Sequence, residues 1–247
     1  MKEQNITVII GDKQFNQRDM SLWMEKRVKK AYKIFGKSID HNDTLFEMNM
    51  KLSDLKARLS DDEIRAILKK KLAISRIMMK MACLFSGGRR RTARTTVLAR
   101  GITAEKFCED LDSLMMISTD ENRRVNLSVY PEHYVLSPGK YGALEVIETT
   151  GNAPFPSQFF ITFNDETGLK EERNISYTHQ SVGVARLNDG TIIGGVRHQF
   201  RNTEEGIECR LAVEFPALSP KSIIRSHQKH LAVEFTNWMN WIIERQK

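Results

Sequence analysis

The spacing of hydrophobic residues along the chain changes in character near residue 118. Before it, Leu, Ile, Met and Phe recur at steps of three and four, which predicts amphipathic helices. After it, apolar and polar residues alternate between clusters that contain Pro and Gly, which predicts strands. The expected helices cover residues 21–35, 45–59, 61–85 and 104–115, and strands are expected at 6–10, 127–136, 143–150 and 158–163.

The third of these helices has the clearest boundaries. Ser60 and Glu63 form the Ser-x-x-Glu pattern, in which two side chains satisfy each other's free backbone amides, and Gly87-Gly88 ends the helix. Its apolar positions form a broad stripe, which we expect to pack into the core of the N-terminal half. Basic residues, among them Lys69 and Arg76, line the opposite face.

The second half is organised around a hairpin. A strong turn signal, Asn188-Asp189-Gly190, separates alternating segments at 181–187 and 191–201, and a third such segment follows at 207–215. A helix over 220–245 has the apolar residues needed to cover one face of this antiparallel sheet. The predicted fold class is therefore α+β. It comprises a helical, basic domain at 1–117 with an Arg-rich loop at 86–96, and a mainly antiparallel β domain at 118–247 closed by the C-terminal helix.

Charge is distributed unevenly along the chain. The segment Ile64–Ala104 holds eleven Lys or Arg residues and no Asp or Glu, whereas residues 105–247 carry a net charge of −5. The whole chain has a formal charge of +7. Because the excess positive charge lies in one segment, the sequence indicates a directed electrostatic surface that favours an anionic partner.

Nucleic acid is the partner that this segment favours most. Lys and Arg contacts to phosphates give salt-sensitive, sequence-independent affinity, and Arg binds phosphate oxygens in a bidentate manner. RNA or single strands are favoured over duplex DNA because no DNA-reading motif is present. We therefore expect a non-enzymatic protein that binds RNA or another polyanion. The expected binding residues are Lys69, Lys70, Lys71, Arg76, Lys80, Arg89, Arg90, Arg91, Arg94 and Arg100.

Two other interpretations of the basic segment remain open. One is a solvated basic face without a partner. The other is a peripheral, matrix-like protein that binds an anionic membrane surface, since a helix with Met, Ile, Leu and Phe opposite Lys and Arg has the composition of an interfacial helix. Against the membrane interpretation, the apolar stripe is expected to be needed for packing.

Enzymatic function has weaker support. No catalytic residues are assigned, and no cofactor is expected because neither a Walker loop nor a Gly-x-Gly-x-x-Gly motif occurs. A metal-dependent hydrolase is the main alternative, with His230 and Glu234 on one face of the terminal helix and His198 from the sheet. A third class is a small-ligand cavity between the sheet and that helix, where Trp238 and Trp241 are the first residues to test.

The remaining features concern location and assembly. Three widely spaced cysteines, the absence of a signal sequence and the absence of a long apolar run lead us to expect an intracellular protein of the cytoplasm or nucleus. The composition is of the kind found in viral nucleic-acid-binding, matrix or movement proteins, without a motif that would assign the chain to one of them. Self-association is an alternative to intramolecular packing for the apolar seam Leu45, Met48, Leu52, Leu55 and Leu59.

Overall fold

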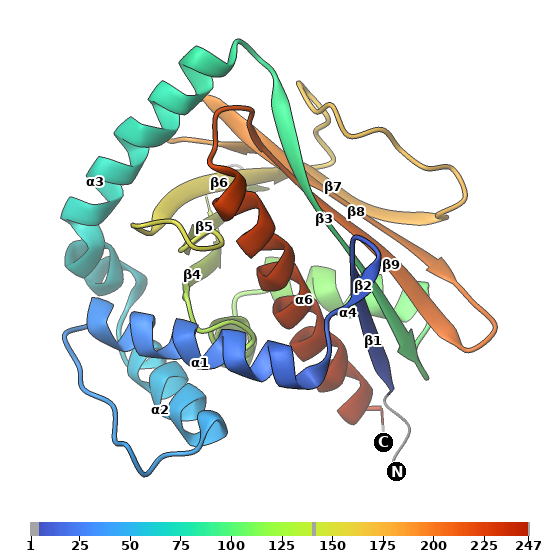
Figure 1. The fold of residues 1–247 in the computed structure, drawn as a ribbon, viewed down its shortest axis with the longest axis horizontal. Coiled ribbons are helices and arrows are strands. Elements are labelled where there is room, and N and C mark those ends of the chain that lie inside the picture. The colour runs from blue at the N-terminus through green and yellow to red at the C-terminus, as the bar shows by residue number, and fades with distance from the viewer. Residues whose placement is uncertain (1–4, 140–141, 247) are drawn as a thin grey trace.

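The structure is a computed structural model that describes residues 5–139 and 142–246. In chain order its elements are β1 (Ile6–Ile10), β2 (Lys13–Gln14), α1 (Gln17–Ile34), α2 (Leu45–Ala57), α3 (Asp61–Ser86), β3 (Arg90–Arg100), α4 (Ala104–Met116), α5 (Asp120–Ser128), β4 (His133–Pro138), β5 (Leu144–Glu148), β6 (Ser157–Phe163), β7 (His179–Arg186), β8 (Ile192–Asn202), β9 (Gly206–Pro216) and α6 (Lys221–Glu244). The expected α+β class is confirmed (Figure 1).

All the strands belong to one antiparallel sheet in the order β2-β1-β3-β9-β8-β7-β6-β5-β4. The predicted meander β7–β8–β9 is present, with the turn at Asn188–Gly190 between its first two strands. Strand β3 comes from the N-terminal half but pairs with β9 along its whole length, from Arg90 opposite Pro216 to Arg100 opposite Gly206. Strands from both sides of the boundary expected after residue 117 therefore belong to one continuous sheet.

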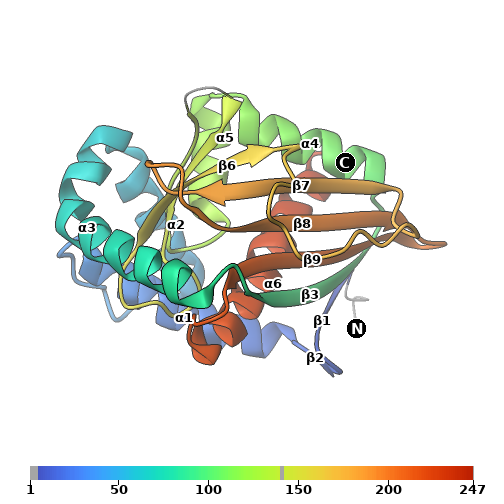
Figure 2. The same cartoon turned by 90° about the horizontal axis from the view of Figure 1, so that it is seen from above.

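Helix α6 lies against one face of this sheet, as Figures 1 and 2 show. Alternate residues of β9, among them Ile207, Cys209 and Leu211, face the same hydrophobic core as Leu231 and Phe235 of α6. A second core cluster lies under α1, α2 and the first half of α3. The opposite face of the sheet was expected to be open to solvent, but the loop 164–178 between β6 and β7 partly covers it. Glutamates of this loop form ion pairs with arginines of the sheet.

The prediction of an Arg-rich loop at 86–96 is wrong, because most of this segment is a strand. Helix α3 ends at Ser86, Gly87 adopts a left-handed conformation with φ of 56°, and strand β3 begins at Arg90. The segment that follows the arginines alternates, so that Ala93, Thr95, Val97 and Ala99 are buried on one face of the strand. That period of two is typical of a half-buried strand, and it outweighs the loop character of the arginines.

Two further elements differ from expectation. Residues 120–128 form helix α5, capped by Thr119, which overlaps the start of the strand expected at 127–136. The apolar stripe of α3 is only partly used for packing: Ile64, Leu68 and Leu72 are buried, but much of the rest of it is exposed.

The three cysteines are free, and Cys209 is buried. None of the helices in the described part of the chain combines the length and the apolar character needed to cross a bilayer.

Candidate metal centre

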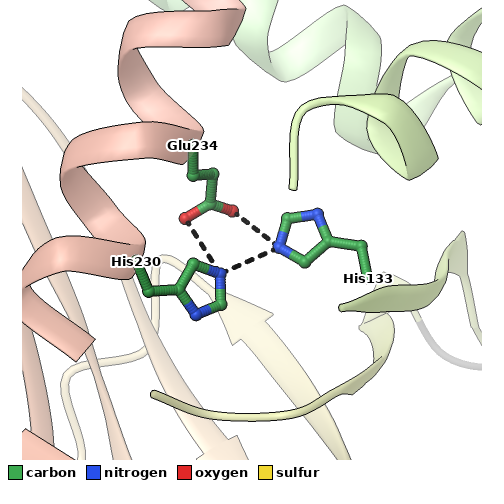
Figure 3. A group of neighbouring side chains, drawn as sticks. All are labelled: His133, His230 and Glu234. Carbon is green, nitrogen blue, oxygen red and sulfur yellow. Dashed lines mark hydrogen bonds and ion pairs between the residues drawn. The ribbon is translucent and has the colours of Figure 1, made fainter. Parts of the chain in front are cut away.

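Two histidines and a glutamate converge inside the protein, between α6 and the start of β4. The Nε2 atoms of His133 and His230 lie 3.0 Å apart, and Glu234 Oε1 lies 3.3 Å from His133 Nε2 (Figure 3). Glu234 Oε2 lies 3.8 Å from His230 Nε2. His230 and Glu234 occupy positions i and i+4 of α6, so both side chains leave the same face of the helix.

The tautomer of His133 is fixed by the backbone. Its Nδ1 lies 2.9 Å from the carbonyl oxygen of Asn126, and because a carbonyl only accepts, this nitrogen carries the proton. In the neutral ring Nε2 is then an unprotonated acceptor, which takes the hydrogen bond from His230 Nε2 and can instead bind a metal ion. A ring held in this way by a carbonyl on its other nitrogen is the usual arrangement of a histidine that binds a metal.

Glu148, at the end of β5, completes the group. Its Oε2 lies 3.6 Å from His133 Nε2 and 3.8 Å from His230 Nε2. Two nitrogens at about 2.0–2.1 Å from one metal ion lie about 2.9–3.4 Å apart for bond angles of about 90–110°. The separation of 3.0 Å between the two histidines falls in that range. The four side chains therefore fit one small divalent cation with two nitrogen and two oxygen donors.

Without a cation, burial favours the neutral form of each of these groups. Burial lowers the pKa of His133 to about 3 and moves the pKa of His230 well below its ordinary value. Burial raises the pKa of Glu148 to about 8, and burial together with the nearby Glu148 raises the pKa of Glu234 well above its ordinary value. A divalent cation reverses this preference for the carboxyls, because two carboxylates and one ion of charge +2 form a neutral unit in the low-dielectric interior.

His227, one turn before His230 on α6, forms a second overlapping group with Glu148 and His230. The Nδ1 atoms of both His227 and His230 are buried and have no hydrogen-bond partner within the described ranges 5–139 and 142–246. Buried polar atoms are normally satisfied, and each exception needs a structural or functional reason. Both unsatisfied nitrogens belong to histidines of this cluster. A role in binding a ligand would explain why these atoms are buried without a partner.

A cavity of about 250 Å³ opens beside this cluster. Its wall is mostly apolar and is formed by α6, by the inner face of the sheet, and by α3 and α4. The carboxylates Glu148 and Glu234 are part of the wall, together with His227, His198 and Trp238. An ion held between the histidines and these carboxylates would therefore lie at the edge of an apolar chamber.

A buried lysine, Lys56, donates hydrogen bonds to the backbone around His133. The side chain of Lys56 is fully buried, and its Nζ donates to the carbonyl oxygens of Leu127, Pro131 and His133 at 2.6, 3.0 and 2.8 Å. These three carbonyls belong to the end of α5 and the turn that leads into β4. Lys56 thus fixes the backbone on which His133 stands.

The structure brings together two of the three metal-site residues named from the sequence. His230 and Glu234 meet as expected, but His198 does not join them; it lies on the cavity wall, where its Nδ1 accepts from the backbone amide of Ala212 at 3.3 Å. His133 and Glu148 were missed as ligands. The spacing of His227, His230 and Glu234 along one helix face was the local signal, and nothing local marks the two residues from the sheet.

The expected nucleic-acid-binding residues differ in their exposure and in their ion pairs. Several are paired: Arg94 with Glu171, Arg100 with Glu205 and Lys80 with Asp189. Arg90 is half-buried beside Glu214, Lys71 is half-buried, and Arg89 and Arg91 are exposed but donate to backbone carbonyls. Lys69, Lys70 and Arg76 on α3 are exposed and form no ion pair with the residues that the structure describes.

The apolar seam proposed for self-association is used within the chain. Met48 and Leu52 are buried in the second core cluster, and Leu45, Leu55 and Leu59 pack against it. This is the intramolecular alternative that the sequence had favoured.

Comparisons with known proteins give no independent guide. No protein-family model matches the chain, and no curated protein shows significant similarity to it. Its function must therefore be inferred from the geometry of its own residues.

Proposed function

We propose that the protein binds one divalent transition-metal ion through His133, His230 and Glu234, with Glu148 as a fourth donor. The observation that carries the proposal is the convergence of four ionisable side chains, from α6 and from strands β4 and β5, around one point in the interior. Each is costly to bury without a partner, and a cation compensates the cost of all four together. A mixed set of imidazole and carboxylate donors favours zinc, iron or manganese over calcium or magnesium.

The chemistry that fits this centre is metal-assisted hydrolysis of a small, largely apolar molecule. In the hydrolytic form of the site His133, His230 and Glu234 would hold the ion and Glu148 would give up its position to a water on the cavity side, since catalytic zinc keeps three protein ligands and one open position. A metal ion lowers the pKa of bound water toward about 7 and polarises a carbonyl oxygen. Glu148 lies on the cavity wall, where a carboxylate can take the proton from that water.

The cavity supports the substrate class. Its wall carries mainly Leu, Ile, Val, Phe and Met side chains, and Glu148, His227 and Glu234 of the cluster are among its polar residues. An apolar chamber with a few polar groups at one end binds molecules with a hydrocarbon body and one reactive polar group. Esters of medium-length fatty acids match this description.

The test begins with the purified protein stripped of metal and titrated with Co²⁺. We expect visible absorption bands of a four- or five-coordinate site in the wild type, and their loss in His230→Ala and Glu234→Gln. The His198→Ala variant is the matched control, because His198 lies on the same cavity wall but outside the group. Hydrolysis of chromogenic esters should require the metal. Bands that persist unchanged in His230→Ala would refute the assignment.

RNA binding, expected from the sequence, is a second proposal, and fewer residues support it than the sequence had suggested. What supports it is the exposed set Lys69, Lys70 and Arg76 together with Arg89 and Arg91. The test is the affinity for single-stranded RNA at increasing salt, compared between the wild type and a variant with Arg89, Arg91 and Arg94 changed to Ala. A salt slope of zero would end this proposal.

A further inference from the structure

Helix α3 carries an exposed apolar stripe that no other part of the described chain covers. The stripe residues are Ile67, Ile74, Ile77, Met78, Met81, Leu84 and Phe85, and their exposed fractions lie between 46 % and 71 %. At about 100° per residue these positions fall within roughly 120° of the helix circumference, so they form one continuous surface. In Figure 1, α3 runs along the edge of the molecule.

This stripe is separate from the face by which α3 packs. The helix is fixed through Leu68, Leu72, Ser75 and Ser86, which lie on a different side and are buried. A contiguous apolar surface of this kind on a folded protein marks an interaction site.

Positive charge flanks the stripe. Lys70 and Lys71 lie within it or at its border, and the exposed Lys69 and Arg76 lie between the stripe and the packed face of the helix. The acidic residues of α3, Asp61 to Glu63, are confined to its first turn, and the five exposed apolar residues from Ile77 to Phe85 occupy the last three turns. The charge around the stripe is therefore complementary to an anionic surface.

We propose that α3 is an interfacial helix that docks the protein on an anionic lipid bilayer. The stripe inserts its Ile, Met, Leu and Phe side chains among the acyl chains, and the flanking Lys and Arg residues contact headgroup phosphates. The apolar residues favour a bilayer over RNA, because a nucleic acid would leave the stripe exposed to water. The sequence left this alternative open; against it stood the expectation that the apolar stripe is needed for packing, whereas much of the stripe is exposed.

The cavity opens at the same surface. Met78 of the stripe and Leu218, in the turn before α6, are about half exposed and also line the cavity. Ser86, at the end of α3, accepts from the backbone amide of Leu218 at 3.0 Å, which places this turn beside the C-terminal end of α3. Docked on a bilayer, the cavity mouth would face the lipid. This last point, that substrate enters from the membrane, rests on the proposed function; the docking itself does not.

The test is co-sedimentation of the full chain with vesicles of phosphatidylcholine alone and with about one third phosphatidylserine. We expect binding to the anionic vesicles that weakens as salt increases. The variant Ile77→Ser, Leu84→Ser, Phe85→Ser should bind at least about tenfold more weakly, since it loses three inserted side chains. The matched control, Phe46→Ser with Ile175→Ser, removes equally exposed apolar residues elsewhere and should bind as the wild type does.

A charge variant separates the two contributions. Lys70→Gln with Arg76→Gln should lower binding to anionic vesicles and leave the weaker binding to neutral vesicles unchanged, whereas Lys13→Gln with Lys37→Gln should change neither. Equal sedimentation of the wild type and the triple stripe variant would overturn the proposal.

Two other outcomes would also overturn it. One is RNA binding through the same lysines without vesicle binding. The other is a stable dimer, seen by light scattering, that the triple stripe variant abolishes and that does not bind vesicles. Because vesicle binding is measured on metal-free protein as well, failure of docking and failure of the metal assignment are distinguishable.

Discussion

The substitution Lys56→Met tests how the interior positions His133. The lysine is fully buried, and its ammonium group satisfies three carbonyl oxygens that accept from no other side chain among the residues that the structure describes. Methionine fills a similar volume but donates nothing. The three carbonyls of Leu127, Pro131 and His133 would then be buried without this donor.

The magnitude follows from two opposing contributions. Each orphaned buried acceptor costs about 1–3 kcal/mol, so three cost about 3–9 kcal/mol. Removal of a buried ammonium returns several kcal/mol of its desolvation penalty. We expect a net loss of about 3 kcal/mol in the free energy of unfolding. Because the backbone of His133 loses its anchor, metal affinity should also fall about 10–100-fold, as it does when the outer partners of metal ligands are removed.

The assays are urea unfolding followed by tryptophan fluorescence and titration of the metal-free protein with Co²⁺. Lys51→Met is the matched control on the same helix: Lys51 is exposed and pairs with Asp43, so its loss should leave the free energy of unfolding close to that of the wild type. The reasoning is refuted if Lys56→Met unfolds within about 0.5 kcal/mol of the wild type.

Three further predictions concern single groups. Burial raises the pKa of Cys108 to about 12. Alkylation of this thiol by iodoacetamide at pH 8, followed by mass spectrometry, should therefore be at least about a hundredfold slower in the native protein than in the unfolded chain. Equal rates would contradict this prediction. The pKa of Glu148 is raised to about 8 and that of Glu234 well above its ordinary value, so a cation must displace protons from both carboxyls, and metal affinity measured by calorimetry should fall by about tenfold to a hundredfold per pH unit between pH 8 and pH 6. A constant affinity would speak against Glu148 as a donor. Glu171→Ala removes the shared partner of Arg94 and Arg210 and should lower the free energy of unfolding by about 2 kcal/mol in urea titrations; no change would show that the network is only a surface feature.

Local signals in the sequence predicted most of the fold. The ends of α3 are set by neighbouring residues, since Ser60 and Glu63 cap its start and Gly87 allows the left-handed turn at its end. The β7–β8–β9 meander follows from alternation and from one turn. Strand β3 was missed because consecutive arginines suggested a solvated loop, whereas Arg94 is accommodated by an ion pair with Glu171, 77 residues away.

The site was less predictable for the same physical reason. His230 and Glu234 share a face of one helix, and helical spacing alone shows that they are neighbours. His133 and Glu148 reach them only because β4 and β5 lie at the edge of the sheet that α6 and α5 approach. Lys56 was also hidden: its position on α2 is consistent with a solvated lysine, and only the three carbonyls of another segment explain why it is buried.

The most direct test of the metal assignment is the metal content of the purified protein, measured by inductively coupled plasma mass spectrometry after dialysis against a weak chelator. The wild type and His198→Ala should each retain about one transition-metal ion per chain, and His133→Ala and His230→Ala should retain essentially none. Protein that neither retains a metal nor binds added Zn²⁺, Mn²⁺ or Fe²⁺, or a His230→Ala variant that binds as tightly as the wild type, would contradict the account.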